Sequence, residues 1–126
     1  MKRVIAFLLL LSSILFGTQS SYKSIDKMQY DCDNNISGVD CLMLSIYYKD
    51  GQQGLQADMN KSISYLDKAC KMNVAVACYN LGNFYAKVKR DRFKALNLYH
   101  KACEKHIVNA CYNFKILTEE TKNTKK

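Results

Sequence analysis

Apolar positions recur with the spacing of an α-helix along most of this chain. Cys78, Leu81, Gly82 and Tyr85 stand at i, i+3, i+4 and i+7, so they form one stripe on a helix. The same spacing recurs in residues 41–48. Glycine costs about 1 kcal/mol in a helix interior relative to alanine. We therefore expect a neighbouring helix to pack closely against Gly82.

The complete pattern predicts an all-α chain. Its expected helices cover residues 22–33, 38–49, 59–71, 75–88, 91–105 and 109–119. The glycine-bearing loop "DGQQGLQAD" follows the second of them, and Asp58 or Asn60 is expected to cap the third. Ser45 is a second small residue at which helices can approach closely.

The predicted helices belong to two alternating types. One type ends in similar nine-residue strings, at residues 24–32, 62–70 and 95–103; the other begins with similar strings, at residues 40–48, 77–85 and 110–118. The second and third strings of the first type, "SISYLDKAC" and "ALNLYHKAC", are offset by 33 residues. Internal similarity at this period is typical of repeat proteins. The chain is therefore predicted to be an αα-hairpin repeat solenoid.

Every one of these strings carries one cysteine. The six cysteines are Cys32, Cys41, Cys70, Cys78, Cys103 and Cys111. An even number in a small exported chain indicates a disulfide framework, although the number alone does not decide the pairing. The chain has no C-x-x-C motif, so neither a zinc ribbon nor a thioredoxin-like site is indicated.

Two cysteines eight positions apart cannot be bridged within one continuous helix. The helix would hold their Cα atoms roughly 12 Å apart, whereas a disulfide needs about 4.4–6.8 Å. If each pair straddles a tight turn between helices, the thiols face each other. This predicts Cys32 with Cys41, Cys70 with Cys78, and Cys103 with Cys111. The first pair is nine apart, so its turn should hold one extra residue, within "NNISG".

The N-terminal residues have the layout of an export signal. Lys2 and Arg3 precede an apolar stretch from Val4 to Phe16, which is shorter than the roughly 20 residues of a membrane-spanning helix. Residues 1–20 are therefore interpreted as a signal peptide cut before Ser21, with an uncleaved anchor as the alternative. Residues 21–118 form the expected repeat domain and 119–126 a basic tail. We expect a secreted or periplasmic protein without a stable membrane anchor.

The chain is basic. Its formal net charge of +8 falls to +6 once the two signal-peptide cations are removed, which favours anionic partners. The lysines are scattered along helix faces and do not cluster beside stacking aromatic residues. Nucleic acid is therefore not predicted as a partner.

The period, the helix pairing and the string "KAC…ACYNLG" resemble the Sel-one-like repeats, relatives of tetratricopeptide repeats. More narrowly, they resemble the Helicobacter cysteine-rich protein family, which implies an exported protein with a bridge inside each unit. Tyr79, Asn80, Leu81 and Gly82 stand at the "CYNLG" positions. The chain is shorter than is usual in that family, with two repeats and a half at each end. Lys115 replaces the small residue, which implies a solvent-facing last helix.

The narrower resemblance also implies slow penicillin binding or hydrolysis, since names in that family often say beta-lactamase. The sequence contains S-x-x-K at Ser20–Lys23 and Ser24–Lys27 but neither S-D-N nor K-T-G, which argues against a serine mechanism. His100, Cys103 and His106 are too few for an open zinc site if Cys103 is bridged. No catalytic residue, metal or cofactor is therefore predicted.

The favoured interpretation is a binding module. In tetratricopeptide-like solenoids, which the chain resembles, the first helix of each unit lines the concave surface. The corresponding candidate binding residues are Tyr47, Asn80, Phe84, Lys87 and Asn113. The expected partner is a protein, a peptide or a peptidoglycan-like glycan. Two alternatives stay open: a weak beta-lactam-binding or beta-lactam-hydrolysing protein, and a structural protein that self-assembles through its terminal helices.

Overall fold

The computed structural model describes residues 23–124, so the predicted signal peptide lies outside the described residues. The elements are α2 (Ile25–Asp33), α3 (Gly38–Asp50), α4 (Met59–Lys71), α5 (Ala75–Phe84), the π-helix η1 (Tyr85–Lys89), α6 (Arg92–Cys103) and α7 (Val108–Asn123). Within residues 23–124 there is no strand. The all-helical prediction is confirmed.

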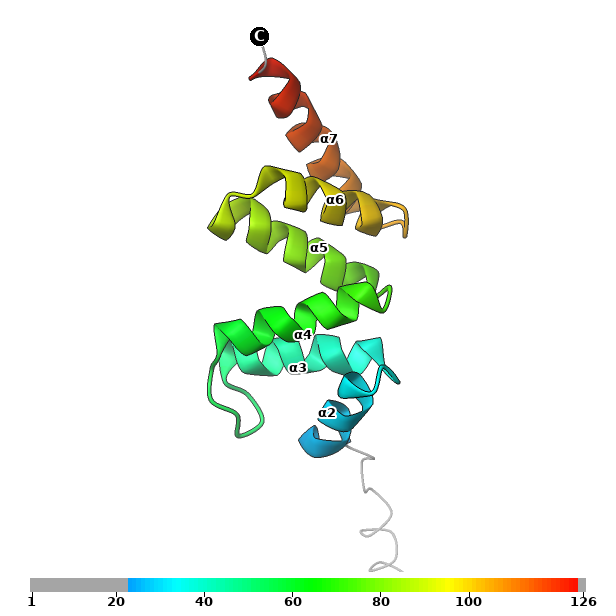
Figure 1. Ribbon diagram of the computed structural model, residues 1–126, viewed down its shortest axis with the longest axis vertical. Coiled ribbons are helices and arrows are strands. Elements are labelled where there is room, and N and C mark those ends of the chain that lie inside the picture. The colour runs from blue at the N-terminus through cyan, green and yellow to red at the C-terminus, as the bar shows by residue number, and fades with distance from the viewer. Residues whose placement is uncertain (1–22, 125–126) are drawn as a thin grey trace, which may run out of the picture.

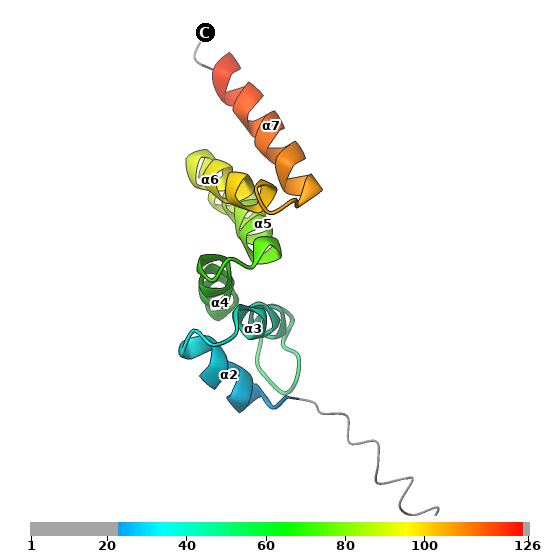
Figure 2. The same ribbon diagram turned by 90° about the vertical axis from the view of Figure 1, so that its right-hand side faces the viewer.

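The helices stack as an elongated zigzag in which each one packs mainly against its neighbours in sequence (Figure 1). Helices α2 and α7 lie at opposite ends of the stack, and the view turned by 90° shows the same order (Figure 2). The turns α2–α3, α4–α5 and α6–α7 lie along one edge, and the α3–α4 and η1–α6 links lie along the other (Figure 1). This is the predicted αα-hairpin solenoid.

The three turns along the first edge share one backbone geometry. Each contains a residue with a positive φ, namely Asn35 at 55°, Asn73 at 64° and His106 at 66°. In the second turn the Asn73 N–H donates to Cys70 O and the Val74 N–H donates to Ala69 O, both at 3.0 Å, and the other two turns repeat this pair of bonds. These bonds define a Schellman motif, which ends a helix with a left-handed residue.

This geometry explains the cysteine spacing. The first cysteine of each pair accepts the inner bond of the motif, and the second lies in the first turn of the next helix. In the second and third turns the residue after the left-handed one is also the N-cap, Val74 or Ile107. The first turn inserts Ser37 as a separate N-cap, whose side chain accepts from the Asp40 N–H at 3.2 Å. Ser37 is the extra residue expected within "NNISG".

All three disulfides join the predicted partners. The Cα–Cα distance is 5.0 Å for Cys32–Cys41 and 4.6 Å for both Cys70–Cys78 and Cys103–Cys111, and no described cysteine is free. Each bridge therefore ties the end of one helix to the start of the next across a tight turn.

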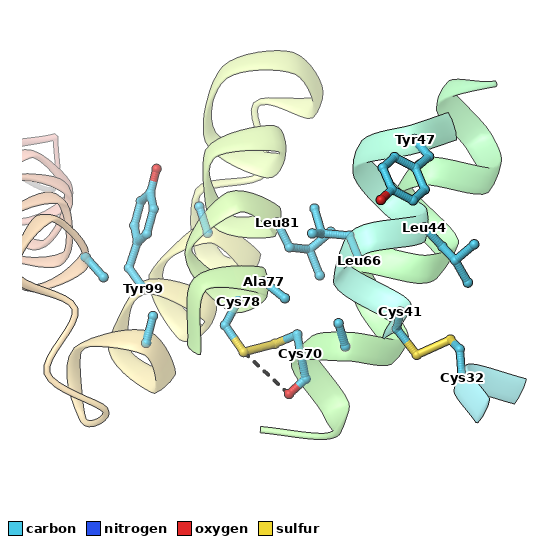
Figure 3. Packing of buried hydrophobic residues seen from close by; sticks show 14 of the residues in the cluster. Cys32, Cys41, Leu44, Tyr47, Leu66, Cys70, Ala77, Cys78, Leu81 and Tyr99 are labelled. Atoms are coloured by element: carbon cyan, nitrogen blue, oxygen red, sulfur yellow. Dashed lines mark hydrogen bonds between the residues drawn. A yellow bond between two sulfur atoms is a disulfide. The ribbon is translucent and has the colours of Figure 1, made fainter. Parts of the chain in front are cut away.

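The core runs along the stack as one cluster of buried side chains. It includes the large side chains of Leu44, Leu66, Leu81 and Tyr99, together with alanines and the first four cysteines (Figure 3). A Cβ atom on Gly82 would lie 2.8 Å from the Tyr99 ring. The expected close approach at Gly82 is therefore confirmed.

The helix ends lie within three residues of the predicted ends, apart from two larger departures. Asp58 caps α4 by accepting from the Lys61 N–H at 3.0 Å, as expected for one of the two candidates. The predicted helix 75–88 instead changes to η1 after Phe84, and the last helix continues to Asn123 beyond the expected end at residue 119. The first part of the segment interpreted as a tail is therefore helical. Lys115 is exposed on α7, as expected for a terminal helix.

We expect Gly82→Ser to lower the free energy of unfolding by about 1–3 kcal/mol, because the added side chain overlaps the buried Tyr99 ring. Chemical denaturation measures the loss. The preceding repeat indicates a compensating substitution, because Ser45 and Leu66 occupy the positions equivalent to Gly82 and Tyr99. Tyr99→Leu in the Gly82→Ser background should recover part of the stability. A double variant whose loss equals the sum of the two single losses would contradict this contact.

Removing the central bridge with Cys70→Ser and Cys78→Ser should lower the unfolding free energy by about 2.5 kcal/mol in the chain-entropy model. The matched variant carries Cys103→Ser and Cys111→Ser. Hydrogen exchange should then show loss of protection on both sides of the turn for the central pair, but mainly in α7 for the terminal pair, since a solenoid unit contacts only its neighbours. The same distribution of hydrogen-exchange protection along the helices in both variants would contradict this expectation.

Candidate functional site

A groove of about 310 Å³ lies between α3, α4 and α5. Its lining residues come from all three helices: Ser45, Ile46, Lys49, Met59, Ser62, Ile63, Leu66, Asn80, Asn83 and Phe84. Helices α3 and α5 contain equivalent repeat strings, at residues 40–48 and 77–85, and α4 lies between them in the stack. The groove therefore occupies the junction of two repeats.

The walls of the groove are mainly apolar. Ile46 and Met59 are exposed there, while Ile63 and Phe84 are half-buried. The Phe84 ring contacts Tyr85 edge to face, with the ring centres 5.4 Å apart, which holds it in place. An apolar side chain of a ligand can be buried between these walls.

The serines in the groove are satisfied internally. Ser62 Oγ donates to Ser45 O, and Ser45 Oγ donates to Leu42 O, both at 2.7 Å. The first bond joins α4 to α3, and the second lies within α3. The serine hydroxyls are therefore structural.

Two amides on α5 supply the polar chemistry. Asn83 Oδ1 accepts from Tyr99 Oη at 2.8 Å and from Asn113 Nδ2 at 3.5 Å. Burial raises the pKa of Tyr99 above its usual value of 10.0, so the phenol keeps its proton and can donate at neutral pH. Within residues 23–124 the Asn80 side chain has no hydrogen-bond partner in the folded chain. Asn80 is exposed and lines the groove, so its amide is available to a ligand.

The predicted binding residues do not all reach this groove. Asn80 and Phe84 line it, and Asn113 is half-buried and bonded to Asn83. The prediction of Tyr47 as a binding residue is wrong, because only 5% of its surface is exposed and its side chain belongs to the core. It follows Leu44 by three positions, so both side chains point to the same buried side of α3.

Lys87 is exposed but does not line the groove. It lies in η1, whose wider turns shift side chains away from the stripe expected for a continuous α-helix. Sequence reasoning also missed Ile46, Ile63 and Asn83. Asn83 follows Asn80 by three positions, which was the signal available for it.

The corresponding positions at the next junction are bonded to one another. Tyr99 replaces Leu66 and donates to Asn83, which also accepts from Asn113. Arg92 of α6 pairs with Glu120 of α7. These contacts tie α5, α6 and α7 together where the preceding junction has a groove.

Residues considered for catalysis or metal binding have structural roles. Ser24 caps α2 by accepting from the Lys27 N–H at 3.3 Å, and Lys27 Nζ lies 2.7 Å from Asp31. Cys103 is bridged, and His106 occupies the left-handed position of its turn. The described residues contain no group of three side chains suited to a metal ion. The motif beginning at Ser20 lies partly outside the described residues.

Comparison with known proteins identifies the repeat. Residues 40–74 and 75–106 each match the Sel1 repeat model, together more than half of the chain. The chain belongs to the Sel1 repeat family. This is the Sel-one-like repeat inferred from the sequence, and such repeats generally mediate protein interactions.

The Sel1 boundaries correct one expectation about the bridges. One matched repeat comprises α3 and α4 and the next comprises α5 and α6, so Cys70 and Cys78 lie in different units. The Cys70–Cys78 bridge therefore joins one matched unit to the next, while the other two bridges join the matched units to Cys32 and Cys111 in the flanking helices. The bridges reinforce the junctions, one of which carries the groove.

Cytochrome c oxidase assembly factor 7A of Xenopus laevis is 35% identical over 54 residues, which are 43% of this chain. The chain spans only 23% of that relative's length. No solved structure shows a significant match. Among residues 23–124, no helix is both long and apolar enough to cross a membrane.

A cluster of charged side chains lies away from the groove, where Lys23 connects α2 to α3. Its Nζ pairs with Asp31 at 2.5 Å and also with Asp40, and both carboxylates are buried. Hydrogen bonds from Lys23 and then Lys27 lower the pKa of Asp31 below its usual 3.8. The same partners, Asp31 first, raise the pKa of Lys23 above 10.5. The cluster holds the first described residue against the repeat stack.

This cluster predicts a loss of stability in acid. Because the folded state lowers the pKa of Asp31, its stabilisation is present above pH 3.8, the unfolded value, and is lost as the pH falls through the folded value. Thermal unfolding should show a steeper fall of Tm below pH 3.8 for the wild type than for Asp31→Asn. The control is Asp26→Asn, an exposed carboxylate of the same helix. Parallel Tm profiles for wild type and Asp31→Asn would contradict the assignment.

Proposed function

We propose that this chain is an exported interaction module that binds a peptide segment of a protein in the groove between α3, α4 and α5. The observation that carries the proposal is the unused Asn80 amide beside apolar walls in a groove at a repeat junction. Sel1 repeats generally mediate protein interactions, which supports a protein-derived ligand.

The groove chemistry favours a peptide. An asparagine side chain has both a donor and an acceptor, so Asn80 can bond the N–H and the C=O of an extended backbone. Asn83 stands one turn away, and its amide nitrogen remains as a donor. Together, Ile46, Ile63 and Phe84 form an apolar surface that can bury one anchor side chain of the peptide. The volume of about 310 Å³ is small, which suits an anchor side chain better than a large ligand.

One rim charge adds selectivity. Lys49 lines the groove, and its nearest carboxylate, Asp50, is 3.8 Å away and exposed. An exposed pair of this kind is weak, so Lys49 can pair with an acidic ligand residue. The proposed ligand is therefore a peptide in which an apolar anchor residue is followed or preceded by an acidic residue.

Export is supported by independent features. The three disulfides are of a kind that persists in oxidising compartments outside the cytosol, and the N-terminal residues have the pattern of a signal peptide. The resemblance to the Helicobacter cysteine-rich proteins points the same way. The protein acts in the periplasm or outside the cell.

The test begins with a library of random 12-residue peptides displayed on phage and selected on the oxidised wild-type protein. A synthetic peptide with the selected consensus is then titrated by calorimetry. We expect an apolar residue beside an acidic one, and we expect Asn80→Ala and Phe84→Ala each to weaken binding at least about tenfold, as for groove-lining anchor positions.

The matched controls are Asn97→Ala and Phe93→Ala, which change the same residue types on exposed positions of α6 outside the groove. Both should bind the peptide like the wild type. If Phe84→Ala binds it unchanged, the groove is not the site. Saturable binding of a peptidoglycan disaccharide that depends on Asn80, with no peptide consensus, would overturn the peptide ligand in favour of a glycan.

A further inference from the structure

The link between α5 and α6 carries an exposed group of cations and apolar side chains. We call residues 87–94, "KVKRDRFK", the basic loop; they comprise the end of η1, the two linking residues and the start of α6. Val88 is 65% exposed and Phe93 is 74% exposed. Lys87, Lys89, Arg90 and Lys94 are exposed around them. Neither the core nor the groove uses these side chains, apart from the contact of Lys89 with Phe84 at the groove edge.

The charge of the basic loop is not neutralised by the fold. Within residues 23–124, no ion pair involves Lys87, Lys89, Arg90 or Lys94. The single carboxylate of the loop, Asp91, accepts from the Lys94 N–H at 3.0 Å and so caps α6. The loop therefore presents an excess of positive charge to an outside partner.

Local contacts hold part of this charge in place. Lys94 Nζ lies 4.1 Å from the centre of the Tyr85 ring, and Lys89 Nζ lies 5.9 Å from the centre of the Phe84 ring. Arg90 ends η1 in the left-handed conformation, with φ at 54°. Lys89 and Lys94 are therefore held against aromatic rings on either side of the Arg90 turn.

The position of the loop leaves it accessible. It lies on the edge opposite the three disulfide-closed turns (Figure 1). The α3–α4 link lies on the same edge; its residues 51–57 are uncharged, and of the two carboxylates that flank them Asp58 caps α4 and Asp50 lies 3.8 Å from Lys49 Nζ. Counted over residues 50–58 and 87–94, the net charge of this edge is positive.

We propose that the basic loop docks the protein on an anionic phospholipid bilayer. The cations pair with lipid phosphates, while Phe93 and Val88 enter the boundary between headgroups and acyl chains. Basic residues next to exposed apolar ones are the combination that peripheral membrane attachment requires. A nucleic acid explains the cations but leaves the exposed Val88 without a role. This docking is independent of the peptide groove, because none of the residues that line the groove belongs to the basic loop.

The chain contains no tryptophan, so Phe93→Trp introduces a single fluorescent reporter. With vesicles of phosphatidylglycerol and phosphatidylethanolamine, its emission should shift to the blue and be quenched by lipids brominated on their acyl chains. The matched control is Val108→Trp, because Val108 is 77% exposed beside the turn on the opposite edge. It should show neither change.

The electrostatic part is tested by sedimentation with the same vesicles. Lys87→Gln with Arg90→Gln should weaken binding by roughly fivefold for each lost cation. The control is Lys105→Gln with Lys115→Gln, which removes the same charge from exposed positions elsewhere and should bind like the wild type.

The proposal would be overturned by equal binding to neutral phosphatidylcholine vesicles, by equal losses in both charge variants, or by a fluorescence change produced by inorganic phosphate alone without quenching by brominated chains. The last result would assign the loop to soluble anions. A reporter that shifts only with an added nucleic acid or acidic protein would likewise exclude the bilayer.

Discussion

The structure depends on the disulfide-closed turns that join the two Sel1 units to each other and to the flanking helices α2 and α7. A helix pair buries only part of its apolar surface, and a solenoid unit contacts only its neighbours. With two complete units, the chain has few junctions over which to distribute its stability. The Schellman turns set the direction of each following helix, and the bridges Cys32–Cys41, Cys70–Cys78 and Cys103–Cys111 constrain the same turns covalently. Backbone geometry and covalent chemistry thus act at the same points.

Differences between the two junctions are small in sequence but large in consequence. At the first, Ser45 and Leu66 leave a groove above an internally bonded floor. At the second, Gly82 admits the Tyr99 ring, whose hydroxyl binds Asn83. Tyr99 thereby fills the junction between α5, α6 and α7. It also donates a hydrogen bond to Oδ1 of Asn83, a residue that lines the groove at the preceding junction. The groove and the closed junction are therefore mechanically connected through α5.

The two edges of the solenoid are chemically distinct. One edge carries the bridges and turns, whose backbone groups are satisfied by the repeated hydrogen bonds. The other carries the α3–α4 link and the two residues between η1 and α6. On this edge, the change to η1 after Phe84 separates the groove from the basic loop. Because the wider turn moves Lys87 away from the groove, cations gather at the edge and the groove remains mainly apolar.

The helix ranges, the two repeating helix types and the disulfide partners were accessible from the sequence, because they depend on local periodicity and on the length of a turn. Asn80 and Phe84 were also found, since they share a stripe on one helix. Burial of Tyr47, displacement of Lys87 by η1 and engagement of Asn113 by Asn83 were not accessible. These depend on what a neighbouring helix covers or on how a helix deviates from its ideal turn. Spacing along the chain determined the repeat, whereas contacts between residues distant in sequence decided which of its surfaces stays open.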